Sequence, residues 1–313
     1  MEAVLYHPEY GYYSRSGDRI GQRGDFYTSG DLDPLFGKLL ARKFAEMALQ
    51  LGSSFTLVEL GAGKGTVARD ILTHRRFPYL ILERSPAMRR HQQKLLQEFD
   101  VEWIDALPSD LQGCVFSNEF LDALPVRRFV RRDGRLKEIF VGEGFCEIEG
   151  EPEVQIDLPI AEGQSADVCL EAPDWIRRIA ASLKRGYHLA IDYGYLRNEF
   201  FNWPRGTLMC YWQHQAVEDP YTRIGCQDIT AHVNFSDLID AGKEAGLELV
   251  GYSNQMNFLV GLGLLDEMRE LTQKADAESI RRMLALKKLL LPGSMGERFK
   301  VLVQKKVEAD LES

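Results

Sequence analysis

A glycine-rich segment carries the strongest chemical signal in the sequence. It begins at Glu59, continues as GAGKGT over residues 61–66, and lies between an apolar run and a stretch of helical periodicity. Glycines at such a junction let the chain turn sharply and let a ligand approach the backbone. A dinucleotide fingerprint would need glycine in place of Thr66, and a P-loop would need longer spacing followed by Lys and Ser or Thr. The pattern instead favours a ligand with a ribose and a cationic amino-acid tail but no phosphate.

Acidic residues stand where such a ligand would need them. Glu59 is expected near the sulfonium or amino group of the ligand. Glu83 ends the next apolar run, where a carboxylate can accept hydrogen bonds from both ribose hydroxyls. Asp105, after the third run, is expected to receive the adenine amino group. These features predict a site for S-adenosyl-L-methionine, and the remaining members of the predicted cofactor-binding set are Gly61, Ala62, Gly63, Gly65, Arg84, Ala106 and Asn118.

Three polar residues after a fourth apolar run could hold a methyl acceptor. Asn118, Glu119 and Asp122 follow residues 114–117, beside the predicted cofactor cleft. A guanidinium group, with a pKa above about 12, must be held by a carboxylate and must lose a proton as its nitrogen is methylated. Glu119 is therefore the expected acceptor-binding carboxylate, and Asp122 would share its face of a following helix. The alternative is structural: Asn118 caps that helix, and both acids stabilise its first turn.

The order of apolar and amphipathic segments predicts how these residues are positioned. Short apolar runs alternate with segments of helical periodicity, which is typical of a doubly wound, mostly parallel α/β sheet of the Rossmann-like kind. We expect seven strands, the last of them at an edge, at residues 55–60, 79–82, 101–104, 114–117, 187–191, 247–252 and 299–303. Helices are expected at residues 35–51, 64–74, 86–99, 173–184 and 235–245.

Three segments break this alternation and are expected to be insertions into a single domain of residues 1–313. Residues 127–160 alternate with period two around RDGR at 132–135, which predicts a β insertion with a hairpin turn. Residues 193–232 form a long irregular stretch of the kind that often serves as a lid or substrate loop. Residues 256–292 are largely helical.

Composition and charge argue against several classes of protein. The net charge of −9 is unlike that of a general nucleic-acid binder, which needs a basic face. Five cysteines without a CxxC pair argue against a disulfide framework and a zinc site. No third ligand accompanies His214 and His232 at metal spacing, so no metal is expected. No apolar stretch is long enough to span a membrane, and residues 1–13 show no signal-peptide pattern.

Several short motifs make the chain similar to a known family. They are YHP at 6–8, GYY at 11–13, GDFYTS at 24–29, ELGAG at 59–63, SNEFLDALP at 117–125, IDYG at 191–194, DITAHV at 228–233 and MGERFK at 295–300. The chain resembles the MidA-type methyltransferases, which include a mitochondrial complex I assembly factor that methylates an arginine of a partner subunit. The resemblance implies a class I methyltransferase fold, S-adenosyl-L-methionine as cofactor and a protein arginine as acceptor. An extra helix that family members usually carry before residues 4–13 is mostly missing, as in a truncated or a naturally short member.

The resemblance also implies roles for residues that spacing alone would not single out. Asp25 and Thr28, within GDFYTS, are expected to bind the cofactor or to form a lid over it. His232, within DITAHV, is expected in the catalytic group as a substrate-loop residue or proton acceptor. A histidine that only packs in its loop is an equal alternative.

The sequence therefore predicts a methyltransferase acting on an arginine of a protein partner, such as a subunit of a respiratory complex. One alternative is methylation of a small molecule or of another side chain. Another is an assembly factor that binds the cofactor without catalysis. Thr66 argues against a dehydrogenase. A homodimer is a further expectation, and the expected compartment is the bacterial cytoplasm or, for an organellar member with a removed targeting segment, the mitochondrial matrix.

Overall fold

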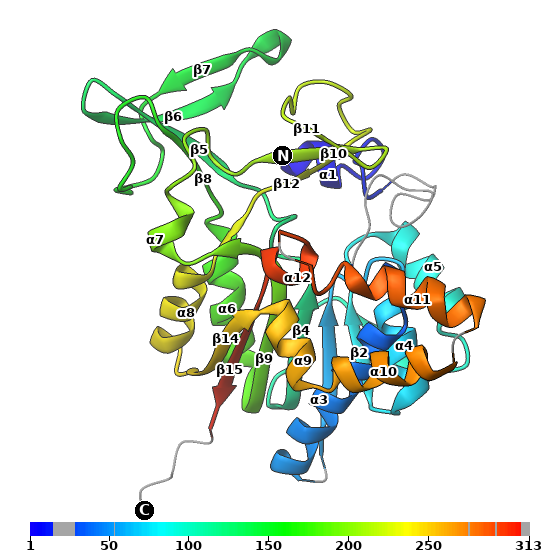
Figure 1. The fold of residues 1–313 in the computed structure, drawn as a ribbon. Helices are drawn as coiled ribbons and strands as arrows, with labels where there is room; N and C mark the ends of the chain where they lie inside the picture. The colour runs from blue at the N-terminus through cyan, green and yellow to red at the C-terminus, as the bar shows by residue number, and fades with distance from the viewer. Residues whose placement is uncertain (15–28, 53, 275, 292, 308–313) are drawn as a thin grey trace, which may run out of the picture.

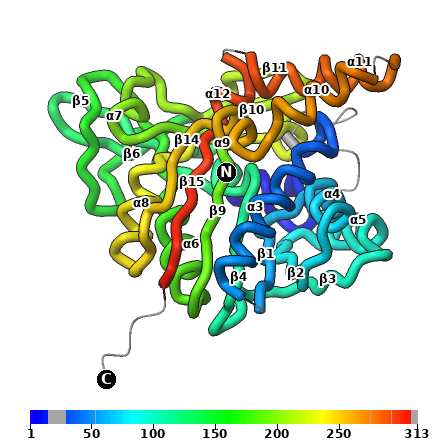
Figure 2. Tube along the Cα trace, turned by 60° about the horizontal axis from the view of Figure 1, so that its bottom comes forward, coloured from blue at the N-terminus to red at the C-terminus, as the bar shows by residue number. Residues whose placement is uncertain are grey.

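The computed structural model of the protein describes residues 1–14, 29–52, 54–274, 276–291 and 293–307. Its largest element is an eight-stranded sheet in the order β14-β15-β9-β4-β1-β2-β3, with the short strand β13 paired to β9. The strands from β14 to β3 can be followed side by side in this order in Figure 2. The strands are β1 Thr56–Leu60, β2 Tyr79–Leu82, β3 Val101–Ile104, β4 Leu111–Asn118, β9 Leu183–Tyr195, β13 Val233–Asn234, β14 Glu248–Asn254 and β15 Phe299–Lys306.

One long strand runs against the others. β1, β2, β3, β4 and β9 pair in parallel, so their carboxyl ends meet at one edge of the sheet. β15 lies antiparallel between β9 and β14. The doubly wound, mostly parallel α/β fold is confirmed, but the prediction that residues 299–303 form an edge strand is wrong. Val301 packs into one core and Leu302 into the other, and a strand buried on both faces belongs inside a sheet.

Two helical layers cover the two faces of the sheet. Because successive side chains of a strand point to opposite faces, Leu57 of β1 packs into one core cluster and Val58 into the other. The first cluster contains helices α3 Leu35–Leu51 and α4 Thr66–His74, and the second contains α6 Glu171–Ser182 and α8 Phe235–Glu244. The short helix α2 Ser29–Leu32 precedes α3, and α5 Pro86–Leu95 connects β2 to β3.

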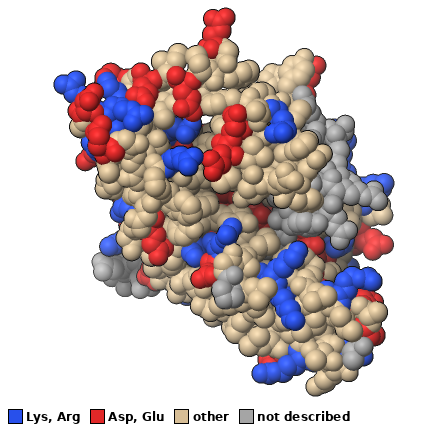
Figure 3. All heavy atoms as spheres, turned by 45° about the horizontal axis from the view of Figure 1, so that its top comes forward, with Lys and Arg blue, Asp and Glu red and all other residues tan. Residues whose placement is uncertain are grey.

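Two smaller sheets stand above the carboxyl edge of the main sheet (Figure 1). One has the order β7-β6-β5-β8, and the other has the order β11-β10-β12. Acidic and basic side chains are interleaved over the first of them, at the upper left of Figure 3, where several form ion pairs. The elements are β5 Arg127–Arg132, β6 Arg135–Val141, a 3₁₀ turn at Glu143–Phe145, β7 Glu147–Gly150, β8 Ser165–Val168, β10 Met209–Trp212, β11 Gln215–Val217 and β12 Asp228–Thr230.

Residues 193–232, expected to be irregular, are more ordered than the sequence pattern indicated. They contain the three-stranded sheet and the short helix α7 Arg197–Phe200. Cys210 and Ile229 of this sheet are buried against Leu5 and Tyr12. Leu5 lies in the N-terminal helix α1 Glu2–Tyr6, and Tyr12 follows that helix. The sheet is therefore stabilised by a segment far away in the sequence, which local patterns do not reveal.

The segment between β14 and β15 in the sequence is largely helical. It contains α9 Gln255–Gly261, α10 Leu264–Lys274, α11 Ala277–Lys287 and α12 Met295–Arg298. Leu259, Leu264 and Leu286 join the core that contains α3. Arg282 of α11 binds Asp33 through two hydrogen bonds of 2.7 and 2.8 Å. Among the described residues, none of the helices combines the length and apolar character that a membrane crossing requires.

Candidate cofactor and acceptor site

A cavity of about 430 Å³ opens at the carboxyl ends of β1, β2 and β4. Open α/β sheets bind their ligands at this edge. Five parts of the described chain line the cavity: the glycine segment with the start of α4, the residues after β2 with the start of α5, the turn after β4, the N-terminal residues and the start of α6. The predicted residues that line it are Glu59, Gly61, Ala62, Gly63, Glu83, Arg84, Asn118 and Glu119.

The glycine segment has a backbone that other residues rarely adopt. Gly61 and Gly65 have φ angles of +63° and +81°. A Cβ on Gly61 would lie 2.8 Å from Cδ2 of Phe120. Gly65 does not line the cavity and instead forms the left-handed N-cap of α4. Gly61 therefore shapes the cavity wall, whereas Gly65 starts the helix behind it.

Glu59 lines the cavity from within β1 and is only 2% exposed. The hydroxyl of Tyr79 donates a hydrogen bond of 2.7 Å to its Oε2. Burial raises the pKa of Glu59 to about 8, against the opposing effect of the Tyr79 hydrogen bond and with a further contribution from Glu83. The carboxyl is therefore mostly protonated at neutral pH, and a cation bound beside it would favour its ionised form. Its contact with a sulfonium or amino group stays a prediction.

Glu83 presents a carboxyl group to the cavity just after β2. Its Oε1 accepts a hydrogen bond of 2.8 Å from the backbone nitrogen of Ser85. Burial raises the pKa of Glu83, and hydrogen bonds from Ser85 and Gln92 oppose this shift. The neighbouring Arg84 lies with its guanidinium carbon 4.8 Å from the ring centroid of Tyr6, and it forms an ion pair with Glu2.

The structure does not bring Asp105 and Ala106 to this cavity. Neither residue is part of its lining, and the Asp105 side chain is 89% exposed. Asp105 pairs with Arg89 of α5, which also donates hydrogen bonds to the carbonyl oxygens of Glu83 and Ile104 at 2.8 and 2.9 Å. Arg89 ties the ends of β2 and β3 together and holds Asp105 on the outside. The expected contact with adenine therefore has no support in this geometry.

The segment after β4 is a turn instead of the expected helix. Asn118 ends the strand, and its Nδ2 donates a hydrogen bond of 3.0 Å to Oε1 of Glu119. Glu119 has a φ of +56°, in the left-handed region that residues other than glycine seldom adopt. Glu119 lines the cavity, but Asp122 does not. The prediction of a helical face shared by Glu119 and Asp122 is wrong, and so is the alternative that Asn118 caps a helix there.

Asp122 instead belongs to a buried acidic cluster with Asp192 of β9 and Asp228 of β12. Burial is the largest cause of the raised pKa of Asp122, and the carboxylates of Asp192, Glu119 and Asp228 raise it further. Asp228 accepts a hydrogen bond of 2.7 Å from the hydroxyl of Tyr13. The carboxyl groups of this cluster, whether ionised or protonated, lie directly behind the turn that carries Glu119.

Asp192 was not among the predicted site residues. Its Oδ2 accepts hydrogen bonds from the backbone nitrogens of Phe120 and Leu121 at 3.2 and 2.8 Å, so it fixes the shape of the turn. Burial raises its pKa to about 7, although these hydrogen bonds favour the ionised form. The sequence signal that could have identified Asp192 as a site residue is its position at the carboxyl end of the strand adjacent to β4.

The N-terminal residues close one side of the cavity. The hydroxyl of Tyr6 donates a hydrogen bond of 2.7 Å to the carbonyl oxygen of Ala123, and Ser85 Oγ donates one of 2.8 Å to the carbonyl oxygen of Tyr13. Residues 1–14 thus connect the turn after β4 with the end of β2. The predicted residues Asp25 and Thr28 lie outside the described part of the chain.

His232 lines a second cavity of about 260 Å³ and not the first one. Its ring packs against Tyr195 and Trp203 at centroid distances of 5.3 and 5.5 Å. Burial and the nearby Arg298 lower its pKa to about 4, so the ring is neutral at pH 7. This environment favours the packing interpretation, and a catalytic role stays a prediction. Nowhere in the described ranges do three or more His, Cys, Asp or Glu side chains gather to hold a metal ion.

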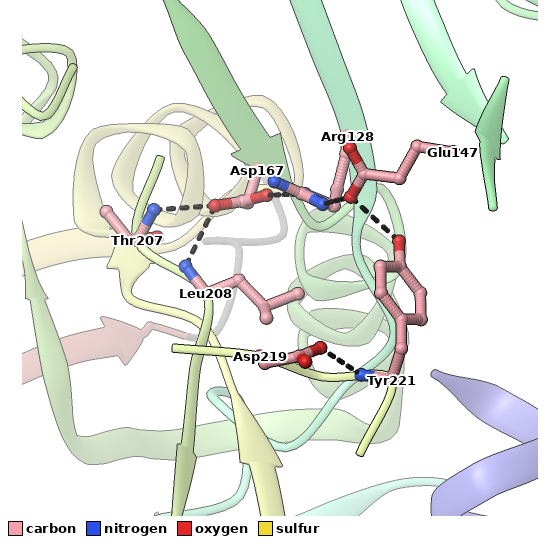
Figure 4. Close-up of polar contacts among 7 residues, drawn as sticks. All are labelled: Arg128, Glu147, Asp167, Thr207, Leu208, Asp219 and Tyr221. Atoms are coloured by element: carbon pink, nitrogen blue, oxygen red, sulfur yellow. Dashed lines mark hydrogen bonds and ion pairs between the residues drawn. The ribbon is translucent and has the colours of Figure 1, made fainter. Parts of the chain in front are cut away.

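A buried aspartate, Asp167 of β8, links the four-stranded sheet to the residues that lead into β10 (Figure 4). Asp167 of β8 accepts hydrogen bonds from Nε of Arg128 at 3.1 Å and from the backbone nitrogens of Thr207 and Leu208 at 2.6 and 2.8 Å. The Oγ1 of Thr207 in turn accepts a hydrogen bond of 3.1 Å from the backbone nitrogen of His232. The position of this segment is therefore coupled to the four-stranded sheet.

Comparison with known proteins identifies the class to which this fold and cavity belong. Residues 39–253 match the family model Methyltransf_28, which describes S-adenosyl-L-methionine-dependent methyltransferases. The chain belongs to this family, and it is a methyltransferase that uses S-adenosyl-L-methionine.

Three relatives describe the similarity more closely. The chain is 30% identical over 364 residues to the mitochondrial protein arginine methyltransferase NDUFAF7 of Bos taurus, covering 96% of this chain and 78% of that protein. It is 29% identical over 355 residues to the same protein of Rattus norvegicus, with the same coverage. A crystal structure from Burkholderia thailandensis, with S-adenosyl-homocysteine bound, is 32% identical and has a TM-score of 0.89 over 97% of this chain and 86% of that chain.

The residues around the first cavity fit such a cofactor. Its volume of about 430 Å³ lies within the usual range for small-molecule sites. Gly61, Glu59 and Glu83 all line the cavity, so glycine backbone and two acidic residues face the space for a ligand. The Oδ1 of Asn118 is buried without a hydrogen-bond partner, so a ligand donor could satisfy it.

Proposed function

We propose that the protein methylates an arginine side chain of a protein partner. The observation that carries this proposal is the group of acids at the turn after β4. Glu119 lines the cofactor cavity, and Asp122 and Asp192 are buried behind it. A guanidinium suits these surroundings because it keeps its positive charge and offers paired donors to carboxylate oxygens. The similar proteins named as protein arginine methyltransferases support the same acceptor.

The residues would divide the work between cofactor and acceptor. Gly61, Glu59, Glu83 and Asn118 would hold S-adenosyl-L-methionine, which when bound supplies an electrophilic methyl group. Glu119 would hold the guanidinium so that one nitrogen faces that group, and orientation is a main source of rate enhancement in transfers of this kind. The transfer would break the bond between this methyl group and its sulfur and leave S-adenosyl-homocysteine. The proton lost by the guanidinium would pass to the carboxylate of Glu119, which lines the cavity.

The partner and the assembly belong to the same proposal. A subunit of a respiratory complex is the partner that the sequence resemblance implies, and the mitochondrial relatives are consistent with it. The homodimer and the compartment stay predictions.

Transfer of a labelled methyl group tests the acceptor. The purified protein is incubated with tritiated S-adenosyl-L-methionine and an extract of cells that lack this protein, and the label is located by hydrolysis and amino-acid analysis. We expect the label in methylarginine within protein. Glu119→Gln should lower the transfer by at least about 100-fold. Its affinity for S-adenosyl-homocysteine, measured by calorimetry, should stay within about threefold of wild type.

Glu218→Gln is the matched control, because Glu218 is an exposed glutamate of the loop after β11. Label found only among small molecules would overturn the arginine assignment in favour of a small-molecule methyltransferase. No label in any fraction, with binding of S-adenosyl-homocysteine intact, would favour an assembly factor that binds the cofactor without catalysis.

A further inference from the structure

We propose that Gln92 is a positioning residue for the cofactor, because its single amide group fixes both the carboxylate of Glu83 and the backbone of the glycine segment. Gln92 lies in α5 and does not line the cavity itself. The inference concerns the cofactor half of the site, so it holds for any methyl acceptor.

The amide of Gln92 makes three hydrogen bonds in a fully buried position. Its Nε2 donates to the carbonyl oxygen of Gly63 at 2.8 Å and to Oε2 of Glu83 at 3.0 Å. Its Oε1 accepts from Nε1 of Trp103 at 2.8 Å. The exposed fraction of Gln92 is 0%. One side chain thereby joins the residues that follow β1 and β2 to strand β3.

Trp103 determines how the amide is oriented. An indole N–H can only donate, so the atom of Gln92 that faces it must be the oxygen. The nitrogen then faces Gly63 and Glu83, and its two hydrogens match these two acceptors. Ser85 donates to the other oxygen of Glu83. Both oxygens of Glu83 therefore face protein donors, which favours the ionised carboxylate and leaves its remaining lone pairs for ligand hydroxyls.

No other side chain of this size satisfies the three partners. A glutamate at position 92 could still accept from Trp103, but its second oxygen would face two acceptors, the Gly63 carbonyl and the Glu83 carboxylate. A methionine would leave the partly buried Trp103 donor and Gly63 acceptor, and the buried Glu83 carboxylate, without this hydrogen-bond partner. Because glutamate and glutamine have nearly the same shape, Gln92→Glu tests the hydrogen bonds and leaves the packing almost unchanged.

The test is the affinity of Gln92→Glu for S-adenosyl-homocysteine, measured by calorimetry across the neutral pH range. We expect the dissociation constant to rise by about 10- to 100-fold in mildly alkaline solution, which corresponds to the loss of a hydrogen bond to a charged group. The loss should shrink in mildly acidic solution, where a protonated glutamate can donate to one acceptor again. The charged or titratable groups around the new carboxyl are Glu83, Arg89 and, beyond them, Glu59. The same measurement on the wild-type protein gives the contribution of these groups to the pH dependence of the affinity.

Gln93→Glu is the matched control. Gln93 is the next residue of the same helix and is exposed. The same change there should leave the dissociation constant within about threefold of wild type. This control accounts for the added negative charge near the site.

A double substitution separates positioning from a purely structural role. Combined with Glu83→Ala, Gln92→Glu should add less to the loss of affinity than it causes alone, because the carboxylate is gone and only the contact with Gly63 remains to be lost. Additive losses, or an unchanged affinity of Gln92→Glu at every pH, would overturn the proposal. If Gln92→Glu does not fold, Gln92→Met takes its place. We then expect a loss of affinity that does not depend on pH, and an unchanged affinity would overturn the proposal. No acceptor is present in these measurements, so their outcome is separate from that of the arginine proposal.

Discussion

The hydroxyl of Tyr79 in β2 donates a hydrogen bond of 2.7 Å to the carboxyl group of Glu59 in the adjacent strand β1. Both side chains are only 2% exposed. The strands are in register with Leu57 opposite Tyr79, so this bond runs diagonally along the pair. It places a titratable carboxyl group within the lining of the cofactor cavity.

Glu59→Gln should change how the stability of the protein depends on pH. The pKa of Glu59 is about 8 in the folded protein and 4.5 ordinarily, so between these values the folded chain holds an extra proton. The free energy of unfolding therefore falls as the pH rises from 4.5 to about 8, and the variant should lose this part of the slope. Urea unfolding across this range measures the effect, with the exposed Glu98→Gln as control. A slope equal to that of wild type would contradict the assignment.

Gly61→Ala should lower both stability and cofactor affinity. The new Cβ meets two penalties, a φ of +63° and a contact of 2.8 Å with Phe120. Gly134→Ala is the matched comparison, because Gly134 has a φ of +71° but open space around its Cβ position. We expect Gly134→Ala to cost about 1 kcal/mol through backbone strain alone and Gly61→Ala to cost more. Thermal unfolding with and without S-adenosyl-homocysteine measures both effects. Equal losses of stability in the two variants would show that the Phe120 side chain moves aside without cost.

Asp167→Asn should destabilise the connection between the smaller sheets. The carboxylate accepts hydrogen bonds from Arg128, Thr207 and Leu208 in a buried position, whereas an amide nitrogen would face a donor. We expect a loss of about 2–4 kcal/mol in the free energy of unfolding. Asp219→Asn, at an exposed aspartate that accepts one bond from the Tyr221 backbone, should cost below about 1 kcal/mol. Similar denaturation midpoints for the two variants would refute this ranking.

Local sequence patterns predicted the parts of the fold that depend on local physics. The strands at residues 79–82 and 101–104 and the helix at 35–51 have the expected bounds. In the strand at residues 79–82 and the helix at 35–51, the apolar residues at the expected spacing are the ones that the fold buries. Gly61 and Glu83 were likewise expected at the cavity, because strand ends of a parallel sheet meet at one edge.

Other features depend on contacts between distant residues. Asp105 directly follows the third strand as expected, but Arg89 of the preceding helix holds it outside the cavity. Asp122 follows Glu119 at helical spacing, yet the backbone bonds of the turn to Asp192 and the left-handed Glu119 turn it toward the acidic cluster. Gln92 did have a local signal, since it lies four residues after Met88 on the buried side of α5. A polar residue on the buried side of a helix needs hydrogen-bond partners inside the protein.

The place of β15 between β9 and β14 makes the completion of the sheet a late event in folding. Phe299 must find Tyr193 across the whole intervening chain before β14 has any neighbour in the sheet. Pairings of such long sequence separation form slowly because a large loop must close first. Until then β9 and β14 expose unpaired edges, which are templates for aggregation. A cut between β14 and β15 that lets β15 separate would recreate this vulnerable state in the mature protein.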